Sequence, residues 1–310
     1  MLTVLQTALE VGLIYGLVAL ALFISFSILN IADLSTDGCF TLGCAVGAML
    51  TIAGHPILAL FAAMAAGMLS GYVTAFLQTR LGVESILAGI ISNTGLYTIN
   101  LAVMGFSSNV SITGVDTVFS LFKGLVGGQW SRLILLALIV AVIVIALIRF
   151  FGTSLGLSIR ATGDSLDMVS ASSINPKATI TIGLCLANAL TALSGCLIGE
   201  YNKFCDINLG TGMVTIALAS LIIGEVFAGH RGGVGKRVVC VVLGSIVYRF
   251  IIALALRLNI SAEYFKLVSA VIVAVAIAAP NMKGYVHLAK IKSNARKLRA
   301  LSGKGDETDA

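Results

Sequence analysis

The chain has 310 residues, of which 58% are hydrophobic and 11% are charged, and its mean hydropathy is +1.03. A soluble globular domain does not reach these values, so the composition indicates an integral membrane protein. The net charge of +6 does not indicate nucleic-acid binding, because the basic residues stand in short flanks and a tail rather than on one folded face.

Uncharged runs of helix length predict an all-α integral membrane protein rather than a β-barrel, whose strands alternate over about ten residues. In chain order, the expected helices are residues 3–29, 37–53, 57–79, 85–104, 132–150, 177–198, 212–228, 238–256 and 264–280. Several are shorter than the roughly 20 residues that cross a bilayer. We therefore expect about eight to ten transmembrane helices, with broken or re-entrant helices within residues 30–53 and 205–229.

The clearest interruption is NIADLSTDGC, residues 30–39, which places two carboxylates between apolar runs. A charge at the bilayer centre costs about 2.5–3.5 kcal/mol on insertion scales, so such groups usually face a protein-lined cavity or a substrate path. The residues of this break that we assign to a substrate path are Asn30, Asp33, Ser35, Thr36 and Asp37. The carboxylates have two possible roles: capping helices and holding packing, which we favour, or carrying a proton or coupling ion.

A second polar break, CDINLGTGMV at residues 205–214, also opens an apolar helix. Paired interruptions in two halves of a transporter point to a binding site at the repeat interface. We therefore expect two pseudo-repeated halves, and we add Thr211 to the substrate path.

Three more polar residues stand inside apolar helices. Asn93 and Asn100 either line the path or form interhelical hydrogen bonds. Arg249 either pairs with an acid, extends to the membrane surface, or recognises a substrate carboxylate. The possible acid partners are Glu10, Asp33, Asp37 and Glu225.

Four G-x-x-x-G spacings predict close helix packing in lipid. They are Gly12/Gly16, Gly43/Gly47, Gly67/Gly71 and Gly195/Gly199. The six cysteines and three histidines have no spacing typical of a metal site or of a catalytic pair, so we assign no catalytic or metal-ligating residue.

The basic residues predict the orientation. The tail at 283–310 is rich in Lys and Arg, which places the C-terminus in the cytoplasm by the positive-inside rule. Counting helices backward places residues 149–177 inside and residues 105–131 outside. We expect a single transmembrane domain over residues 1–282 and a partly disordered basic tail over 283–310.

Residues 156–176, GLSIRATGDSLDMVSASSINP, form the most polar internal segment. Capping chemistry before Leu166 and a stop at Asn175-Pro176 indicate a short cytoplasmic helix, within a loop at about 153–176 that docks a soluble partner. A plain solvated loop is the alternative. The candidate docking residues are Arg160, Gly163, Asp164, Asp167, Met168, Ile174 and Asn175.

These motifs resemble a known family. RATGD followed by INPK and a helix with LTALSG is similar to the coupling loop of ABC importer permeases of the branched-chain amino acid and ribose type. LNIADLSTDG and IIGEVFAGHRGGVG also resemble that family, and LSTDGCFTLG and LYTINLAVMG resemble a subgroup associated with aromatic amino acid uptake. The chain departs from the pattern at residues 168–173, MVSASS, where related permeases have Ala-Ala and then Gly.

The resemblance implies a permease subunit of an ATP-driven ABC importer, in the plasma membrane of a bacterium, that takes up an amino acid, with an aromatic one indicated. It implies two ABC ATPase subunits, a second permease copy in a homodimer, and an extracytoplasmic substrate-binding lipoprotein as partners. The chain itself is not expected to be an enzyme or to bind a cofactor. RGGVGKR at 231–237 lacks the phosphate-loop pattern, so ATP and Mg²⁺ belong to the partner ATPase.

Two alternatives stay open. The chain is a sugar or nucleoside permease of the same class, or an ion- or proton-coupled secondary transporter with Asp33 and Asp37 at a broken helix.

Overall fold

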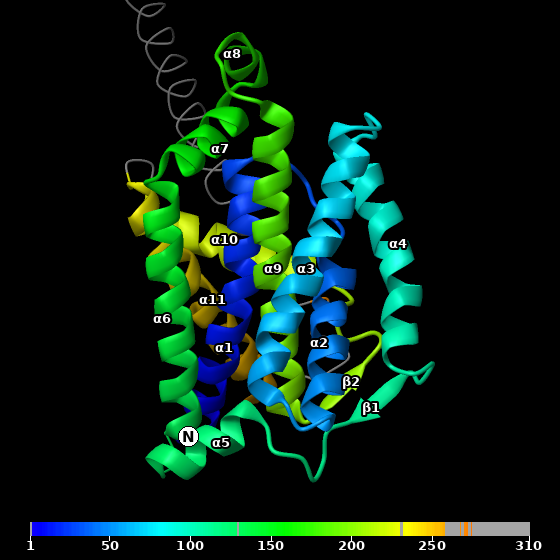
Figure 1. Cartoon of the computed structure of the whole chain (residues 1–310). Coiled ribbons are helices and arrows are strands. Elements are labelled where there is room, and N and C mark those ends of the chain that lie inside the picture. The colour runs from blue at the N-terminus through cyan, green and yellow to red at the C-terminus, as the bar shows by residue number, and fades with distance from the viewer. Residues whose placement is uncertain are drawn as a thin grey trace, which may run out of the picture.

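The protein is an elongated helical bundle in the computed structural model (Figure 1). The structure describes residues 2–128, 130–229 and 232–257, and four isolated positions at 267, 270, 271 and 274. Most of the predicted helix 264–280 and all of the predicted tail 283–310 lie outside the described residues.

The described elements confirm the all-α prediction. The long apolar helices are α1 (Leu2–Leu22) with its π-helical extension η1 (Phe23–Ile28), α3 (Pro56–Thr79), α4 (Ser85–Val103), α6 (Ser131–Phe151), α9 (Pro176–Asn202) and α11 (Val234–Arg257). In the described part of the chain, six helices are therefore long and apolar enough to cross a membrane. Two shorter apolar helices, α2 (Thr36–Ile52) and α10 (Met213–Ala228), follow the two predicted breaks.

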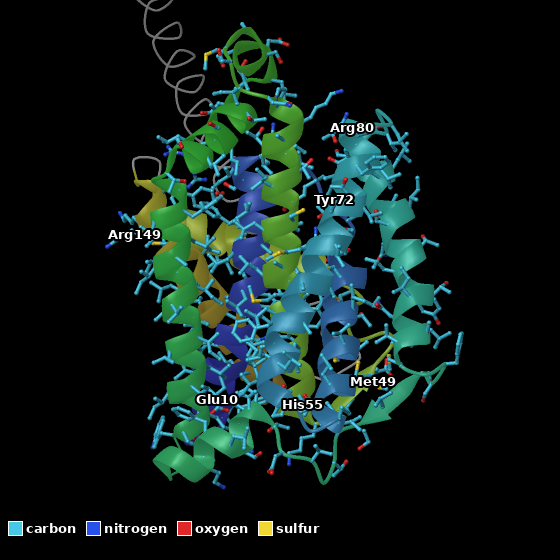
Figure 2. The ribbon with its side chains drawn as sticks, viewed as in Figure 1. Glu10, Met49, His55, Tyr72, Arg80 and Arg149 are labelled. Carbon is cyan, nitrogen blue, oxygen red and sulfur yellow. The ribbon has the colours of Figure 1, made fainter. Side chains whose placement is uncertain are left out.

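The remaining elements lie at the ends of the bundle. Helices α7 (Ser154–Asp164) and α8 (Leu166–Ala171) project from one end, where the sequence predicts one short helix. Helix α5 (Val118–Val126) and the antiparallel strands β1 (Asn109–Ser111) and β2 (Phe204–Asp206) lie at the other end, and the sequence analysis missed all three. The predicted inside segment 149–177 and the predicted outside segment 105–131 therefore lie at opposite ends of the bundle. In Figure 2, Arg80 and Arg149 are on the side of the α7–α8 end, and His55 and Met49 are at the other end.

The two halves of the bundle pack reciprocally. The first half runs α1, break, α2, α3, and the second runs α9, break, α10, α11. Helix α3 packs along α9, and α11 packs along α1, so the last helix of each half lies on the first helix of the other. This exchange agrees with the predicted pseudo-repeat.

All four G-x-x-x-G spacings lie at contacts between the two halves: two at α2–α9, one at α3–α9 and one at α1–α11. A Cβ atom at Gly43 of α2 would overlap the Ala192 carbonyl oxygen of α9, and one at Gly195 of α9 would overlap the Phe40 carbonyl oxygen of α2. Gly67 faces the Asn188 carbonyl of α9. A Cβ at Gly12 of α1 would lie 3.0 Å from the Ile246 Cα of α11. The prediction of close packing is confirmed.

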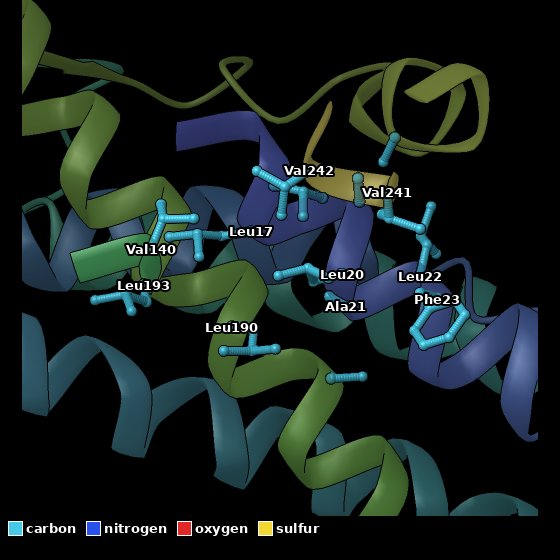
Figure 3. Packing of buried hydrophobic residues seen from close by; sticks show 14 of the residues in the cluster. Leu17, Leu20, Ala21, Leu22, Phe23, Val140, Leu190, Leu193, Val241 and Val242 are labelled. Atoms are coloured by element: carbon cyan, nitrogen blue, oxygen red, sulfur yellow. The ribbon is translucent and has the colours of Figure 1, made fainter. Parts of the chain in front are cut away.

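The main apolar core lies around α1 and α9. Leu17 and Leu20 of α1 and Phe23 of η1 belong to one cluster with Leu190 and Leu193 of α9 (Figure 3). Val140 of α6 and Val241 of α11 complete the same cluster. Most of α1 and α9 is buried, whereas only 22% of the α6 span is buried, so α1 and α9 form the centre to which the breaks are attached.

The close contact between α2 and α9 gives a first test. We expect Gly43→Val to lower the melting temperature of the purified chain in detergent, because the new side chain must displace the Ala192 backbone, at a cost of at least about 1–3 kcal/mol. Gly95→Val on α4 is the matched control, since a Cβ there meets nothing within 4 Å. An equal effect of the two substitutions would contradict the packing.

Candidate functional site

The two polar breaks meet inside the bundle. Asp37, in the first turn of α2, accepts hydrogen bonds from the backbone amides of Gly212 (2.9 Å to Oδ2) and Val214 (2.9 Å to Oδ1) at the start of α10. One turn further along α2, Thr41 Oγ1 accepts from the Gly210 amide at 3.1 Å. The first break thus binds the second through side chains on one face of α2.

Asp37 acts chemically as the cap of α10. The first amides of a helix have no partner within it, and the helix dipole favours a negative charge at that end. Gly212, the residue before α10, has φ +87°, a conformation that glycine adopts without strain. A Cβ atom at Gly210 would overlap the Asp37 carbonyl oxygen, so the second break lies directly on α2.

Asp33 fixes the start of α2 to the middle of α9. Its buried carboxylate accepts from the Ser35 amide (2.8 Å) and hydroxyl (2.6 Å) through Oδ1, and from Asn188 Nδ2 (2.8 Å) through Oδ2. Thr36 Oγ1 donates to the Asp33 carbonyl oxygen at 3.1 Å. Both carboxylate oxygens have partners, which is the arrangement of a structural cap.

Helix α4 lies against the same region. Asn100 Nδ2 donates to the Gly38 carbonyl oxygen at 3.0 Å, and a Cβ at Gly38 would lie 2.6 Å from Asn93 Oδ1. The structure therefore brings both asparagines to the first turn of α2. Their sequence-based assignment left hydrogen bonding and path lining open, and Asn100 makes the expected interhelical bond.

The polar residues of the two breaks and of α4 differ in how far they are buried. Asp33, Ser35, Thr36 and Asn100 are buried, and Asp37 and Asn93 are partly buried. Asn30, with φ 55°, and Thr211 are exposed. Exposed polar groups beside a break in an apolar bundle are available to a polar solute or to another chain.

Arg249 has an aromatic partner in place of an acid. Its guanidinium lies over the Tyr15 ring, 3.8 Å from the centroid, and Tyr15 in turn lies 6.1 Å from the Phe40 ring of α2. Its buried Nε has no hydrogen-bond partner among the described residues. The acids named as possible partners bond elsewhere: Asp33 and Asp37 at the breaks, Glu10 with Gln6 and Tyr201, and Glu225 with Arg237. Among the described residues, the predicted alternative that Arg249 pairs with an acid is therefore wrong.

The sequence analysis missed a polar contact behind the breaks. Arg237 of α11 and Glu225 of α10 form an ion pair with 2.6 Å between Nη2 and Oε1. Ser27 of η1 hydrogen bonds to both, and the Arg237 guanidinium lies 5.2 Å from the Phe23 ring centroid. The sequence does place an acid, Glu225, near the end of one apolar run and a base, Arg237, near the start of the next. No sequence pattern indicates that Ser27 joins them.

The predicted docking segment is folded, contrary to the alternative of a plain solvated loop. Ile159 and Val169 are buried beneath α7 and α8, whereas Arg160, Asp164, Asp167 and Met168 are exposed. Ile174 is partly buried, and Asn175 Oδ1 caps α9 by accepting from the Lys177 amide at 3.0 Å.

Gly163 sets the position of α7 on the bundle. A Cβ at Gly163 would overlap the Ile28 carbonyl oxygen at the end of η1. Helix α7 therefore packs directly on the turn that opens the first break.

The fold and the paired breaks define a helical membrane protein with a polar site inside its bundle, which is an arrangement of membrane transport proteins. The model of the family described as "Branched-chain amino acid transport system / permease component" matches residues 4–277. The chain belongs to this family and is a permease component of a transport system.

Two curated relatives align along nearly the whole chain. The tyrosine transport system permease protein of Clostridioides difficile (strain R20291) is 31% identical over 94% of this chain and 95% of its own length. An uncharacterised protein of Rickettsia prowazekii (strain Madrid E) is 31% identical over 88% of this chain and 96% of its own length. No solved structure matches.

The cap on α10 gives a second test. We expect Asp37→Ala to destabilise the chain by about 1–3 kcal/mol, because two amides of the second break lose their acceptor away from water. Hydrogen exchange of residues 210–216 should become faster. Asp116→Ala, which removes an exposed carboxylate bonded to Ser120, should leave this exchange unchanged. Unchanged exchange in Asp37→Ala would refute the capping role.

Proposed function

We propose that the chain is the transmembrane subunit of an ATP-driven importer of an amino acid, in the plasma membrane of a bacterium with the C-terminus in the cytoplasm. The observation that carries this proposal is the packing of α7 on the turn that opens the first break. A partner that holds α7 and α8 acts on the polar site through a direct contact. The family match and the resemblance of this segment to ABC coupling loops support an ATPase as that partner.

Two ATPase subunits would hold two copies of the chain, each by the exposed side chains of α7 and α8. These side chains combine charge with apolar surface, since Leu157, Leu166 and Met168 are exposed beside Arg160 and Asp164. ATP and Mg²⁺ would bind to the ATPase, and this chain would be no enzyme. A substrate-binding lipoprotein would deliver the solute at the end of the bundle that carries α5, β1 and β2.

The substrate path would follow the accessible polar groups of the two breaks. Asn30 and Thr211 are exposed, and Asn93 and Asp37 are partly accessible. Ser35, Thr36 and Asn100 are buried and would shape the path. Arg249 lies over Tyr15 and would act through the aromatic contact of Tyr15 with α2.

The proposed substrate is an aromatic amino acid, with tyrosine as the first compound to test. The support is the 31% identity over 94% of the chain to a protein named as a tyrosine transport system permease. The sequence motifs LSTDGCFTLG and LYTINLAVMG point to the same subgroup. A sugar or nucleoside substrate has no comparable support.

A variant at Asp33 separates the importer from a proton-coupled transporter. In Asp33→Asn, Oδ1 still accepts from Ser35, and Nδ2 can donate to Asn188 once the Asn188 amide turns its unpartnered Oδ1 toward it, which gives up the Asn188 bond to the Leu184 carbonyl oxygen. We expect ATP-dependent tyrosine uptake within about fivefold of the unmodified chain, as the loss of one hydrogen bond of about 1 kcal/mol implies. The assay uses proteoliposomes with the ATPase and the binding protein.

Loss of uptake in Asp33→Asn with the fold intact would favour a proton-carrying carboxylate. Uptake by the purified chain alone, driven by an ion gradient and indifferent to ATP, would overturn the ATP-driven proposal.

The docking segment allows binding and coupling to be tested separately. We expect Arg160→Ala with Asp164→Ala to lose co-purification of the ATPase at least tenfold, since charged interface contacts are worth about 1.5–3 kcal/mol each. The charge-matched control is Lys123→Ala with Asp116→Ala, exposed at the other end. Retained association and uptake in the first double variant would reject the docking assignment.

Gly163→Val tests the contact behind the docking surface. Its side chain faces the Ile28 backbone rather than solvent, so we expect ATPase binding to persist while uptake falls about tenfold or more, as the cost of about 1–3 kcal/mol for overpacking implies. The measurement compares uptake with ATP hydrolysis in the same proteoliposomes. An equal loss of binding and uptake would show that α7 serves only as a docking surface.

A further inference from the structure

A cavity lies at the α7–α8 end of the bundle, between the last turns of α3 and the first turns of α9. Its volume is about 310 Å³. Two basic side chains, Arg80 and Lys177, line it together with the hydroxyls of Thr79 and Thr181 and the aromatic rings of Tyr72 and Phe76. No acidic residue is among its lining residues. Tyr72 and Arg80 mark this region at the upper right of Figure 2.

The positive charge of the cavity is not balanced by a carboxylate. Within the described ranges, the one ion pair joins Arg237 to Glu225, and neither Arg80 nor Lys177 takes part in it. Lys177 also stands in the first turn of α9, where the helix dipole adds to the positive potential. The cavity therefore favours an anion with several oxygen acceptors.

An exposed apolar surface begins at the same cavity. Phe76, Tyr72, Leu69 and Phe61 are exposed along α3 at spacings near whole helix turns, and Leu69 and Phe61 expose 68% and 66% of their surface. No Lys or Arg precedes Arg80 in the sequence, so this surface carries no positive charge until the cavity is reached. The face thus places a cationic cavity at one end of an apolar stripe that is about 22 Å long from Phe61 to Phe76 at 1.5 Å per residue.

A cationic cavity beside an apolar stripe fits a ligand that has both an anionic group and long apolar chains. A soluble phosphate would use the cationic cavity but not the stripe, and an uncharged lipid would use the stripe but not the two cations. We propose that the cavity binds the phosphate headgroup of an anionic phospholipid, with its acyl chains along the exposed face of α3. The site stands on this cavity and stripe alone, independently of the transported solute.

The experiment measures lipid contact at the cavity itself. Trp130, the single tryptophan, lies at the start of α6 at the other end and is changed to Phe. Tyr72→Trp then supplies a fluorescent reporter at the cavity. The full chain is placed in nanodiscs of phosphatidylcholine with either brominated phosphatidylglycerol or brominated phosphatidylcholine at equal mole fraction, and quenching of the reporter gives the relative affinity of the site.

We expect brominated phosphatidylglycerol to quench more strongly, and the preference to fall about fivefold for each basic residue removed by Arg80→Gln or Lys177→Gln. Arg80→Lys keeps the charge and should keep most of the preference, which separates loss of charge from misfolding. Arg149→Gln is the matched control: it is exposed at the same end but on the opposite side of the bundle in Figure 2.

Three results would overturn the proposal. The first is equal quenching by the two lipids in the reporter chain. The second is a preference that survives the loss of both Arg80 and Lys177. The third is relief of the phosphatidylglycerol quenching by millimolar inorganic phosphate, which would assign the cavity to a soluble anion.

Discussion

The structure depends on how the backbone of two helix breaks is satisfied within an apolar bundle. An amide without a partner in such a place costs several kcal/mol, so an interrupted helix persists only where another group accepts from it. Asp37 meets that requirement for α10, and Asp33 meets it for α2 through Ser35. The acceptor for the second break is a side chain of the first, and the Asp33 carboxylate of the first break also accepts from Asn188 of α9. Each break therefore makes hydrogen bonds to the other half of the chain.

Several features of this arrangement were predictable from local sequence. Long uncharged runs located the spanning helices, and the polar residues at 30–39 and 205–214 located both breaks. The partner of Asp37 was not predictable, since Gly212 lies 175 residues away and many amides were equally eligible. Helix α5 was missed for a related reason: its first amide, Val118, is capped by Glu200 from α9, a contact that no local pattern indicates. For Arg249 the sequence left an acid partner, extension to the membrane surface and recognition of a substrate carboxylate open, whereas its position over the Tyr15 ring depends on a contact between α1 and α11 that no local pattern indicates.

Close backbone contact decides which parts of the bundle can move independently. Gly43 and Gly195 bring α2 and α9 together at backbone distance, and Gly67 does the same for α3 and α9. Interfaces that admit no Cβ atom resist sliding, because any shift brings carbonyl groups into overlap. Helices α2, α3 and α9 therefore behave as one packed unit. The break that precedes α10 lies on the same unit, because a Cβ atom at Gly210 would overlap the Asp37 carbonyl oxygen of α2.

A displacement of α7 has a short physical route to both breaks. Gly163 rests on the carbonyl of Ile28, and the Leu29 side chain fills the space that Gly183 leaves on α9. Ser27, in the same turn, hydrogen bonds to Glu225 and Arg237, which belong to α10 and α11. Because one turn of η1 touches the docking segment on one side and the second half of the bundle on the other, a movement imposed at α7 cannot act on the first break alone. In the proposed importer, this turn converts a push on the docking segment into a change at the junction of α2 and α10, where Asp37 joins the two halves.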